Sequence, residues 1–209
     1  WLMRGGVCLM IGLLGITLIL PLWWLLSKSF EDRDGAFVGL ANYIEYFSTP
    51  ALFASVWNSL FIAFLSTAIV LPLAFVYAYA LQRSCMRWKG LFQGLALIPI
   101  LAPSLLPAIS LIYLFGNQGF LKEWMFGVEI YGPVGIVISQ VFYCFPHALM
   151  ILLAALSMAD SRLYEAADVL GASKLRVFFT VTLPGAKYGV ISAGFVVFTL
   201  VMTDFGIAK

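Results

Sequence analysis

Residues 160–184 read DSRLYEAADVLGASKLRVFFTVTLP, a charged stretch between two long apolar segments. Four of its residues have the i, i+3, i+4 and i+7 spacing of one helical face: Leu163, Ala166, Ala167 and Leu170. Asp160 or Ser161 can cap the start of this helix, and Gly171 can end it because glycine tolerates left-handed backbone. The pattern predicts a short amphipathic helix followed by a sharp turn.

A second helix is expected after this turn. Ser173 can cap it, and the same helical spacing recurs at Leu175, Phe178, Phe179 and Thr182. Pro184 suits the first turn of a third helix, where its missing N–H leaves no donor unpaired. The stretch is therefore predicted to form a helix, a glycine turn, a second helix and then a membrane helix.

The composition indicates an integral membrane protein. Of the 209 residues, 63% are hydrophobic and 11% charged, and the mean hydropathy is +1.01. Five runs contain no Asp, Glu, Lys or Arg: 5–27, 46–82, 90–121, 130–159 and 188–203. The first four exceed the roughly 20 residues that a helix needs to cross a bilayer. Lys187 can lengthen the fifth by extending its stem to the headgroups.

We predict an all-α membrane protein, a polytopic helical bundle, because strands of a β-barrel would alternate in polarity and be shorter. The expected spans are about 7–26, 54–81, 91–115, 133–156 and 184–206, and the loop 157–183 joins the last two. The first span is too long for a signal peptide and lacks a small-residue cleavage site. Because the chain begins at Trp1 and ends where the fifth span does, we expect a fragment.

The basic residues predict the orientation. With the loop 157–183 set on the inner side, eight basic residues lie there: Arg4, Arg83, Arg87, Lys89, Arg162, Lys174, Arg176 and Lys187. Four lie on the other side: Lys28, Arg33, Lys122 and Lys209. Basic residues collect on the cytoplasmic side of membrane proteins, so we expect the N-terminus and this loop in the cytoplasm.

Three features of the loop together resemble the EAA loop in permease subunits of binding-protein-dependent ABC importers. They are the triplet 165–167, Gly171 four residues later, and the ending Val181-x-Leu183-Pro184, where the family prefers isoleucine at the first position. The resemblance implies a coupling helix that docks on a cytoplasmic ATPase through Arg162, Leu163, Tyr164, Glu165, Ala166, Ala167, Asp168, Leu170, Gly171, Ser173, Leu183 and Pro184. The alternative is an amphipathic helix lying on lipid, which its alanine-rich stripe disfavours.

The resemblance also implies a fold and partners. The fold is that of a type I ABC importer permease in the bacterial inner membrane, here with five spans. The partners are a cytoplasmic ABC ATPase dimer, a periplasmic substrate-binding protein and a second permease half, fused or separate. Residues 39–43 (GLANY) resemble a stretch found before the second span of such permeases, although a short surface helix is the plainer interpretation.

Four further segments resemble most closely the permeases assigned to 2-aminoethylphosphonate uptake, which are related to ferric-iron importers: 83–86 (RSCM), 97–106 (LIPILAPSLL), 143–148 (YCFPHA) and 203–206 (TDFG). The resemblance implies 2-aminoethylphosphonate as the substrate, with ferric iron or another small solute as the alternative. Composition alone identifies no substrate.

Several residues within the spans are candidates for a translocation pathway. Pro99, Pro103 and Pro107 recur every four residues, so the third span must kink or unwind. Their face is expected to look into the bundle, because only protein or water can satisfy the freed carbonyls. Whether it lines the pathway or only bends the helix stays open. Asn58 can face the pathway, although helix packing is the default.

The remaining pathway candidates are His147, Thr203 and Asp204. A histidine in a span is costly without a partner, and we favour a neutral imidazole bonded to a neighbouring helix over a metal ligand. Asp204 can face a vestibule or lie among headgroups. Cys8 and Cys144 lie in spans and Cys85 in a loop, so we predict no disulfide and no metal site.

No catalytic constellation is present in the sequence. A membrane enzyme needs a polar cluster within the spans, where only His147 is a candidate, and a channel needs charged rings or a filter sequence. The chain lacks a glycine-rich phosphate loop with Lys-Ser/Thr, so a separate ATPase must hydrolyse ATP. We therefore expect a permease that is not an enzyme, needs no cofactor and binds no nucleic acid.

Overall fold

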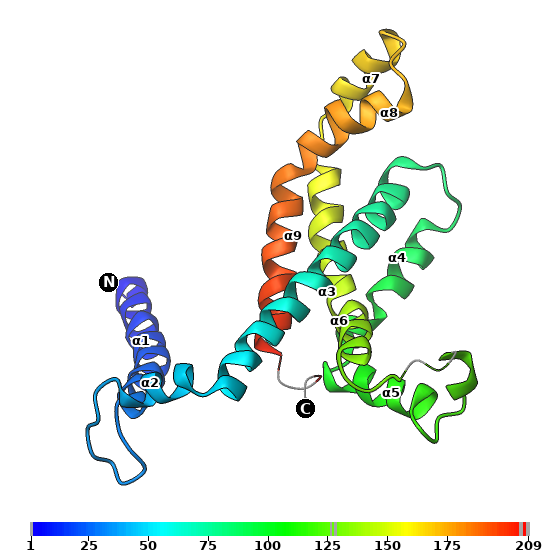
Figure 1. Ribbon diagram of the computed structural model, residues 1–209. Helices are drawn as coiled ribbons and strands as arrows, with labels where there is room; N and C mark the ends of the chain where they lie inside the picture. The colour runs from blue at the N-terminus through cyan, green and yellow to red at the C-terminus, as the bar shows by residue number, and fades with distance from the viewer. Residues whose placement is uncertain (1, 126, 128, 205–206, 208–209) are drawn as a thin grey trace. The chain divides into compact units, whose positions relative to one another are not determined.

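The computed structural model describes residues 2–125, 127, 129–204 and 207 (Figure 1). The chain divides into two compact units, Trp1–Trp57 and Asn58–Lys209. Apart from one isolated β-bridge between Glu31 and Phe37, the regular secondary structure of the described part is helical. The predicted all-α fold is confirmed.

The first unit contains helices α1 (Leu2–Ser29) and α2 (Ala41–Ser48) and the beginning of α3 (Pro50–Arg83). The amide of Asn42 donates to the carbonyl oxygens of Ser29 and Glu31 at 3.0 Å each. The hydroxyl of Tyr43 donates to Ser29 Oγ at 2.7 Å. The GLANY stretch thus fastens a short helix to the end of α1, which gives it a structural role within this unit.

The second unit has its core between α3, α6 (Pro133–Ser157) and α9 (Leu183–Thr203). The contact between α6 and α9 is the most extensive between two helices. Small residues make it close, and a Cβ added at Gly189 would overlap the Cβ of Ala155. Alanines 63, 74, 78, 148, 186 and 193 are all buried. Close approach of small residues is how helices associate in lipid, where apolar burial alone gives little driving force.

Aromatic contacts join α3 to the other helices. Phe64 meets Phe198 of α9 edge-on with ring centroids 5.1 Å apart. Tyr77 meets Phe145 of α6 in the same way at 5.6 Å, and its hydroxyl donates to the carbonyl of Phe92 at 2.9 Å. Phe92 lies in α4 (Lys89–Leu97), so one tyrosine connects three helices.

The third expected span kinks and unwinds so far that it forms two helices. After α4 come a 3₁₀ turn (η1, Ile98–Leu101) and then α5 (Leu105–Phe115), with a bend of 99° between the two helical pieces. Pro99 lies in η1, Pro103 lies in the break between Leu101 and Leu105, and Pro107 lies inside α5. Pro99 and Pro107 are half-buried and Pro103 is exposed. The three prolines therefore do not form the single inward face that the spacing predicts, because the bend redirects the chain between them.

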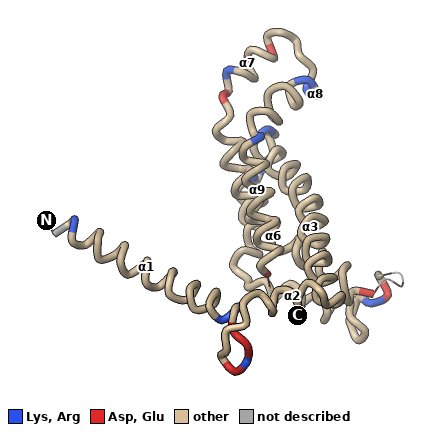
Figure 2. Tube along the Cα trace, turned by 60° about the vertical axis from the view of Figure 1, so that its left-hand side comes forward, with Lys and Arg blue, Asp and Glu red and all other residues tan. Residues whose placement is uncertain are grey.

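Within the described residues, four helices are long and apolar enough to cross a membrane: Met3–Ser29, Pro50–Arg83, Pro133–Ser157 and Lys174–Thr203. The bent pair α4–α5 makes a fifth if it counts as one span. These helices cover the spans expected from the sequence, except that the expected end at Gly206 lies outside the described residues. Figure 2 shows that charged residues are nearly absent from the long helices and gather near their ends.

Candidate functional site

The helix that contains the Glu-Ala-Ala triplet is α7 (Ser161–Val169), and both of its ends are closed by the loop itself. Asp160 Oδ1 accepts from the N–H of Arg162 at 2.9 Å, which selects Asp160 over Ser161 as the cap. At the other end Gly171 has φ +66°. The N–H groups of Gly171 and Ala172 donate to the carbonyls of Asp168 and Ala167, both at 3.0 Å. These two bonds form a Schellman motif, for which glycine is the usual residue.

The chain after the glycine turn is one continuous helix rather than two. Ser173 Oγ accepts from the N–H of Arg176 at 3.4 Å and caps α8 (Lys174–Val177). A π-helical turn (η3, Phe178–Thr182) then leads into α9 without a break. In this turn the N–H of Leu183 donates to the carbonyl of Phe178, five residues earlier. Pro184 lies in the first turn of α9, as the sequence predicts, but no break precedes it, because the π-turn re-registers the backbone where proline lacks a donor.

One face of α7 is turned toward the rest of the chain. Only Tyr164 and Ala167, three residues apart, are half-buried, while the other seven residues of this helix are exposed. The hydroxyl of Tyr164 donates to Thr182 Oγ1 at 3.1 Å. The guanidinium carbon of Arg83, the last residue of α3, lies 3.7 Å from the centre of the Tyr164 ring. Such cation–π contacts contribute about 0.5–2 kcal/mol depending on desolvation.

The π-turn is itself packed against α3. The ring of Phe178 meets Tyr79 at 5.4 Å and Phe75 at 5.9 Å between centroids, both nearly edge-on. Phe75, Tyr79 and Arg83 stand at i, i+4 and i+8, so they form one stripe on α3. This stripe of α3 therefore contacts both the π-turn, through Phe178, and α7, through Tyr164.

The other faces of the loop expose large apolar side chains. The exposed fractions are 56% for Leu163, 88% for Val169, 83% for Leu170 and 73% for Leu175. We call these four residues the loop surface. Figure 1 shows α7 and α8 at one end of the second unit, beyond the bundle of α3, α6 and α9. Sequence reasoning named Leu163 and Leu170 but missed Val169, which lies off the predicted stripe, and Leu175, which was assigned to the second helix without a site role.

Charged residues surround the loop surface. Arg162, Glu165 and Asp168 are exposed on α7, and Lys174 and Arg176 lie on α8. Figure 2 shows both basic and acidic residues on α7 and α8, at this end of the second unit. Apolar side chains rimmed by charges are typical of a protein-binding surface rather than of a face that rests on solvent.

Polar residues gather at the other end of α9. Gln140 of α6 is 1% exposed, and its Nε2 donates to Asp204 Oδ2 at 2.9 Å. The same carboxylate oxygen accepts from the N–H of Ile207 at 3.2 Å, and Cys144 Sγ donates to Gln140 Oε1 at 3.8 Å. Asp204 is thus bound to α6 rather than left among headgroups. Gln140 was not named as a candidate, although a glutamine in a charge-free run is the signal that could have found it.

The other pathway candidates do not join this cluster. Asn58 and Thr203 are exposed, and Thr203 Oγ1 donates to the carbonyl of Thr199 in its own helix at 2.8 Å. His147 is half-buried, with Nδ1 3.1 Å from the carbonyl oxygen of Tyr143. That partner lies one turn earlier in α6, not on a neighbouring helix. Among the described residues no group of His, Cys, Asp or Glu could hold a metal.

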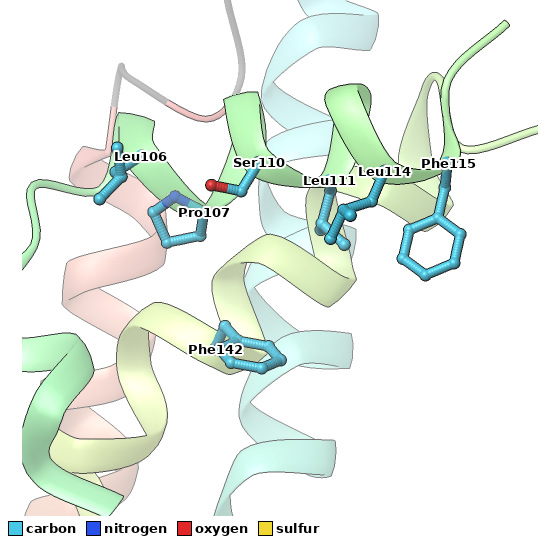
Figure 3. A pocket seen from close by; sticks show the side chains of 7 residues that line it. All are labelled: Leu106, Pro107, Ser110, Leu111, Leu114, Phe115 and Phe142. Atoms are coloured by element: carbon cyan, nitrogen blue, oxygen red, sulfur yellow. The ribbon is translucent and has the colours of Figure 1, made fainter. Parts of the chain in front are cut away.

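A pocket of about 370 Å³ lies between α5 and α6. Figure 3 shows side chains of α5 directed toward α6, where Phe142 lines the opposite wall. Ser110 is the one polar side chain of the lining, which otherwise consists of Leu106, Pro107, Leu111, Leu114, Phe115 and Phe142. Pro107 therefore belongs to an apolar pocket, and the remaining candidates lie elsewhere.

Residues 70–209 match the family described as the binding-protein-dependent transport system inner membrane component. The chain is 28% identical over 203 residues to the spermidine/putrescine transport system permease protein PotB of Haemophilus influenzae, covering 91% of this chain and 71% of that protein. It is 32% identical over 152 residues to the molybdenum transport system permease protein ModB of the same organism, covering 71% and 66%.

A third relative is the spermidine/putrescine transport system permease protein PotC homolog of Mycoplasma genitalium, 29% identical over 178 residues that cover 85% of this chain and 58% of that protein. The chain thus spans between 58% and 71% of the length of these relatives. It belongs to the family of binding-protein-dependent inner membrane transport components. Members are permease subunits of ABC importers and are not enzymes, since ATP hydrolysis is done by a separate ATPase.

Proposed function

We propose that this chain forms part of the translocation pathway of an ATP-driven importer and receives the motion of a cytoplasmic ATPase through the loop 157–183. The observation that carries the proposal is the loop surface, four large apolar side chains that are more than half exposed beside the Glu-Ala-Ala triplet. A surface of this kind is stable in water when a protein partner covers it. The loop is closed at both ends by its own bonds, so it can present this surface in one shape.

The orientation of the proposal places the loop and the N-terminus in the cytoplasm. The excess of Lys and Arg on this side supports it, since eight of the twelve basic residues fall there. The turn between α3 and α4, which contains Arg87, lies at the same end of the second unit as α7 and α8 (Figure 1). The bacterial inner membrane is the compartment that fits the family description.

The proposed partners follow from this arrangement. An ATPase dimer covers the loop surface, a periplasmic substrate-binding protein delivers the solute on the opposite side, and a second permease half completes the pathway. Family membership implies these three kinds of partner in general. The proposal allows the second permease half to be either fused to this chain or a separate subunit.

We propose 2-aminoethylphosphonate as the substrate, with ferric iron or another small solute as the alternative. The four segments 83–86, 97–106, 143–148 and 203–206 support it by resemblance. The relatives found are named for polyamines and for molybdenum, so family membership leaves the substrate class open. The charge-free runs 46–82, 90–121, 130–159 and 188–203 offer no Lys or Arg to select an anion, which assigns much of the selectivity to the binding protein.

A purified binding protein from the same operon tests the substrate directly. Calorimetric titration with 2-aminoethylphosphonate, ferric citrate, spermidine and molybdate should give tight binding for the first compound alone. Binding of spermidine or molybdate instead would overturn the phosphonate assignment and leave the importer assignment intact.

Co-purification tests the coupling loop. The full transporter should bring down its ATPase, and Glu165→Arg or Gly171→Pro should abolish the association because each alters the triplet or the Schellman motif. Glu123→Arg is the matched control, since Glu123 is an exposed acidic residue in η2 (Lys122–Met125), outside the loop. Retention of the ATPase by both loop variants, or uptake that persists without the ATPase, would contradict the proposal.

A further inference from the structure

We propose that Tyr164 is a positioning residue that transmits the displacement of α7 to α3 and to the π-turn at the start of α9. This inference rests on the proposed coupling function of the loop. It changes the expected role of Tyr164, which the resemblance placed among the residues that meet the ATPase. The ring instead points toward the permease's own helices, where it contacts Arg83 and Thr182.

The contact with Thr182 places Tyr164 on a buried group. Thr182 is 1% exposed, and its hydroxyl accepts the bond from Tyr164 at 3.1 Å. A buried hydroxyl that loses its hydrogen-bond partner destabilises the structure around it. If α7 moves far enough to break the bond from Tyr164, the buried hydroxyl of Thr182 loses its partner. The position of α7 therefore affects the stability of the π-turn.

The contact with Arg83 ties the same ring to α3. The side chain of Arg83 is half-buried, and among the described residues its Nε has no hydrogen-bond partner. The Tyr164 ring, 3.7 Å from the guanidinium carbon, is thus the group that the structure shows stabilising this charge. Moving the ring away would remove this cation–π contact.

The position of Thr182 in the π-turn explains how the contact can transmit motion. Thr182 is the last residue of the π-turn, whose first residue, Phe178, is packed on Phe75 and Tyr79 of α3. A π-turn holds one residue more than an α-turn, and such turns inside helices often lie at functional sites. Tyr164 is therefore hydrogen-bonded to the last residue of the π-turn, while the first residue of that turn packs against α3.

These contacts define a path for motion. A push on α7 by the ATPase changes the distance from Tyr164 to Thr182 and to Arg83, and α9 and α3 follow through the turn and the stripe. The loop surface and the inward ring lie on different sides of α7, so binding of the partner and transmission of its motion use separate residues. Substitutions of Tyr164 should therefore alter coupling while leaving assembly unchanged.

The test uses the complete transporter, with its ATPase and binding protein, in proteoliposomes. The readouts are ATP hydrolysis with and without the binding protein as purified, the KM for ATP, and the amount of ATPase that co-purifies. Tyr164→Phe removes the bond to Thr182 and keeps the ring over Arg83. We expect the stimulation by the binding protein to fall roughly two- to tenfold, the range of one hydrogen bond, with KM and assembly unchanged. Tyr188→Phe is the control, because Tyr188 is a 71% exposed tyrosine on α9.

A second pair of variants examines the other partner of the bond. Thr182→Val should reproduce the effect of Tyr164→Phe, and the double variant should be no worse than either single one, since both remove the same bond. Thr180→Val is the matched control, because Thr180 lies in the same π-turn but bonds the carbonyl of Arg176 at 2.7 Å.

Each outcome separates the inference from the proposed function. Unchanged stimulation in Tyr164→Phe and Thr182→Val, with the ATPase still bound, overturns the role of Tyr164 and leaves the coupling loop standing. Additive effects of the two substitutions also overturn it. Failure of the unaltered chain to bind an ATPase overturns the proposed function instead.

Discussion

Two segments of this chain meet the same chemical problem and solve it differently. Prolines interrupt the backbone at residues 98–104, between α4 and α5, and at the entry to α9, where Pro184 follows the π-turn. The first interruption becomes a bend of 99° between two helices. The second is absorbed within one helix that runs from Lys174 to Thr203. Proline removes one donor and clashes with the preceding turn in both places, so the ring alone does not decide the outcome.

The difference lies in what packs against each segment. Phe178 is held by two aromatic rings of α3, and Thr182 is buried and bonded. At the α4–α5 break, Ile98 is 56% exposed and Leu101 is 85% exposed. The backbone at the entry to α9, where Phe178 is enclosed by α3, re-registers through a π-turn. The more exposed backbone between α4 and α5, where η1 contacts α6, separates into two helices. At these two segments the packing around the prolines differs, although packing is not required everywhere, since α1 continues through the exposed Pro21.

Removing the ring of Phe178, which packs the π-turn against α3, should have the largest effect on stability. Phe178→Ala loses both ring contacts with α3, and we expect the free energy of unfolding to fall by about 2–3 kcal/mol, below the value for a fully enclosed phenylalanine. Phe179→Ala is the control, because Phe179 is 61% exposed. Thermal melts of the purified chain in detergent measure both variants. Equal losses for the two would remove the basis of the comparison.

A smaller effect, of opposite sign in the two regions, is expected from glycine substitutions. In α9, Gly189→Ala would overlap Ala155 of α6, and we expect a loss of about 1–2 kcal/mol from overpacking. In α4, Gly94 has nothing within 4 Å of an added Cβ, so Gly94→Ala should gain about 0.5–1 kcal/mol through helix propensity. Denaturant titration in mixed micelles resolves the sign. A gain at both glycines would show that α9 is packed no more closely than α4.

The smallest change in stability should come from the prolines themselves. Pro184→Ala and the double variant Pro99→Ala with Pro103→Ala should each change the free energy of unfolding by less than about 1 kcal/mol. Their local effects should differ. The double variant allows α4 to extend across residues 98–104, whereas the helix around Pro184 is already continuous. Hydrogen exchange at residues 98–104 should slow in the double variant, while exchange around 178–184 should hardly change in Pro184→Ala. Slower exchange around 178–184 with no change at 98–104 would show that the bend between α4 and α5 does not depend on its prolines.

Local signals in the sequence predicted the ends of the loop helices well. Asp160, Gly171 and Ser173 act through atoms within five residues of themselves, so their residue types suffice to place the caps and the turn. The all-helical fold followed from runs of apolar residues in the same way. The family resemblance, carried by the triplet and the Leu-Pro ending, is consistent with the family match.

Contacts between distant residues were not accessible from the sequence. Tyr164 and Arg83 are far apart in the chain, as are Gln140 and Asp204, and no spacing rule connects them. The continuity of the helix through Pro184 depends on Phe178 packing against α3, which periodicity alone could not reveal. The roles assigned to Asn58, Thr203 and His147 remain predictions for the same reason.

The Schellman motif at Gly171 also bears on how fast a transporter of this kind can assemble. Because the backbone groups at both ends of α7 already have partners in the free chain, an arriving subunit has no folding to induce. Association then loses little conformational entropy, and its rate is set by diffusion and by the surrounding charges. The glycine that closes α7 thus lets the proposed ATPase meet a loop that is already folded.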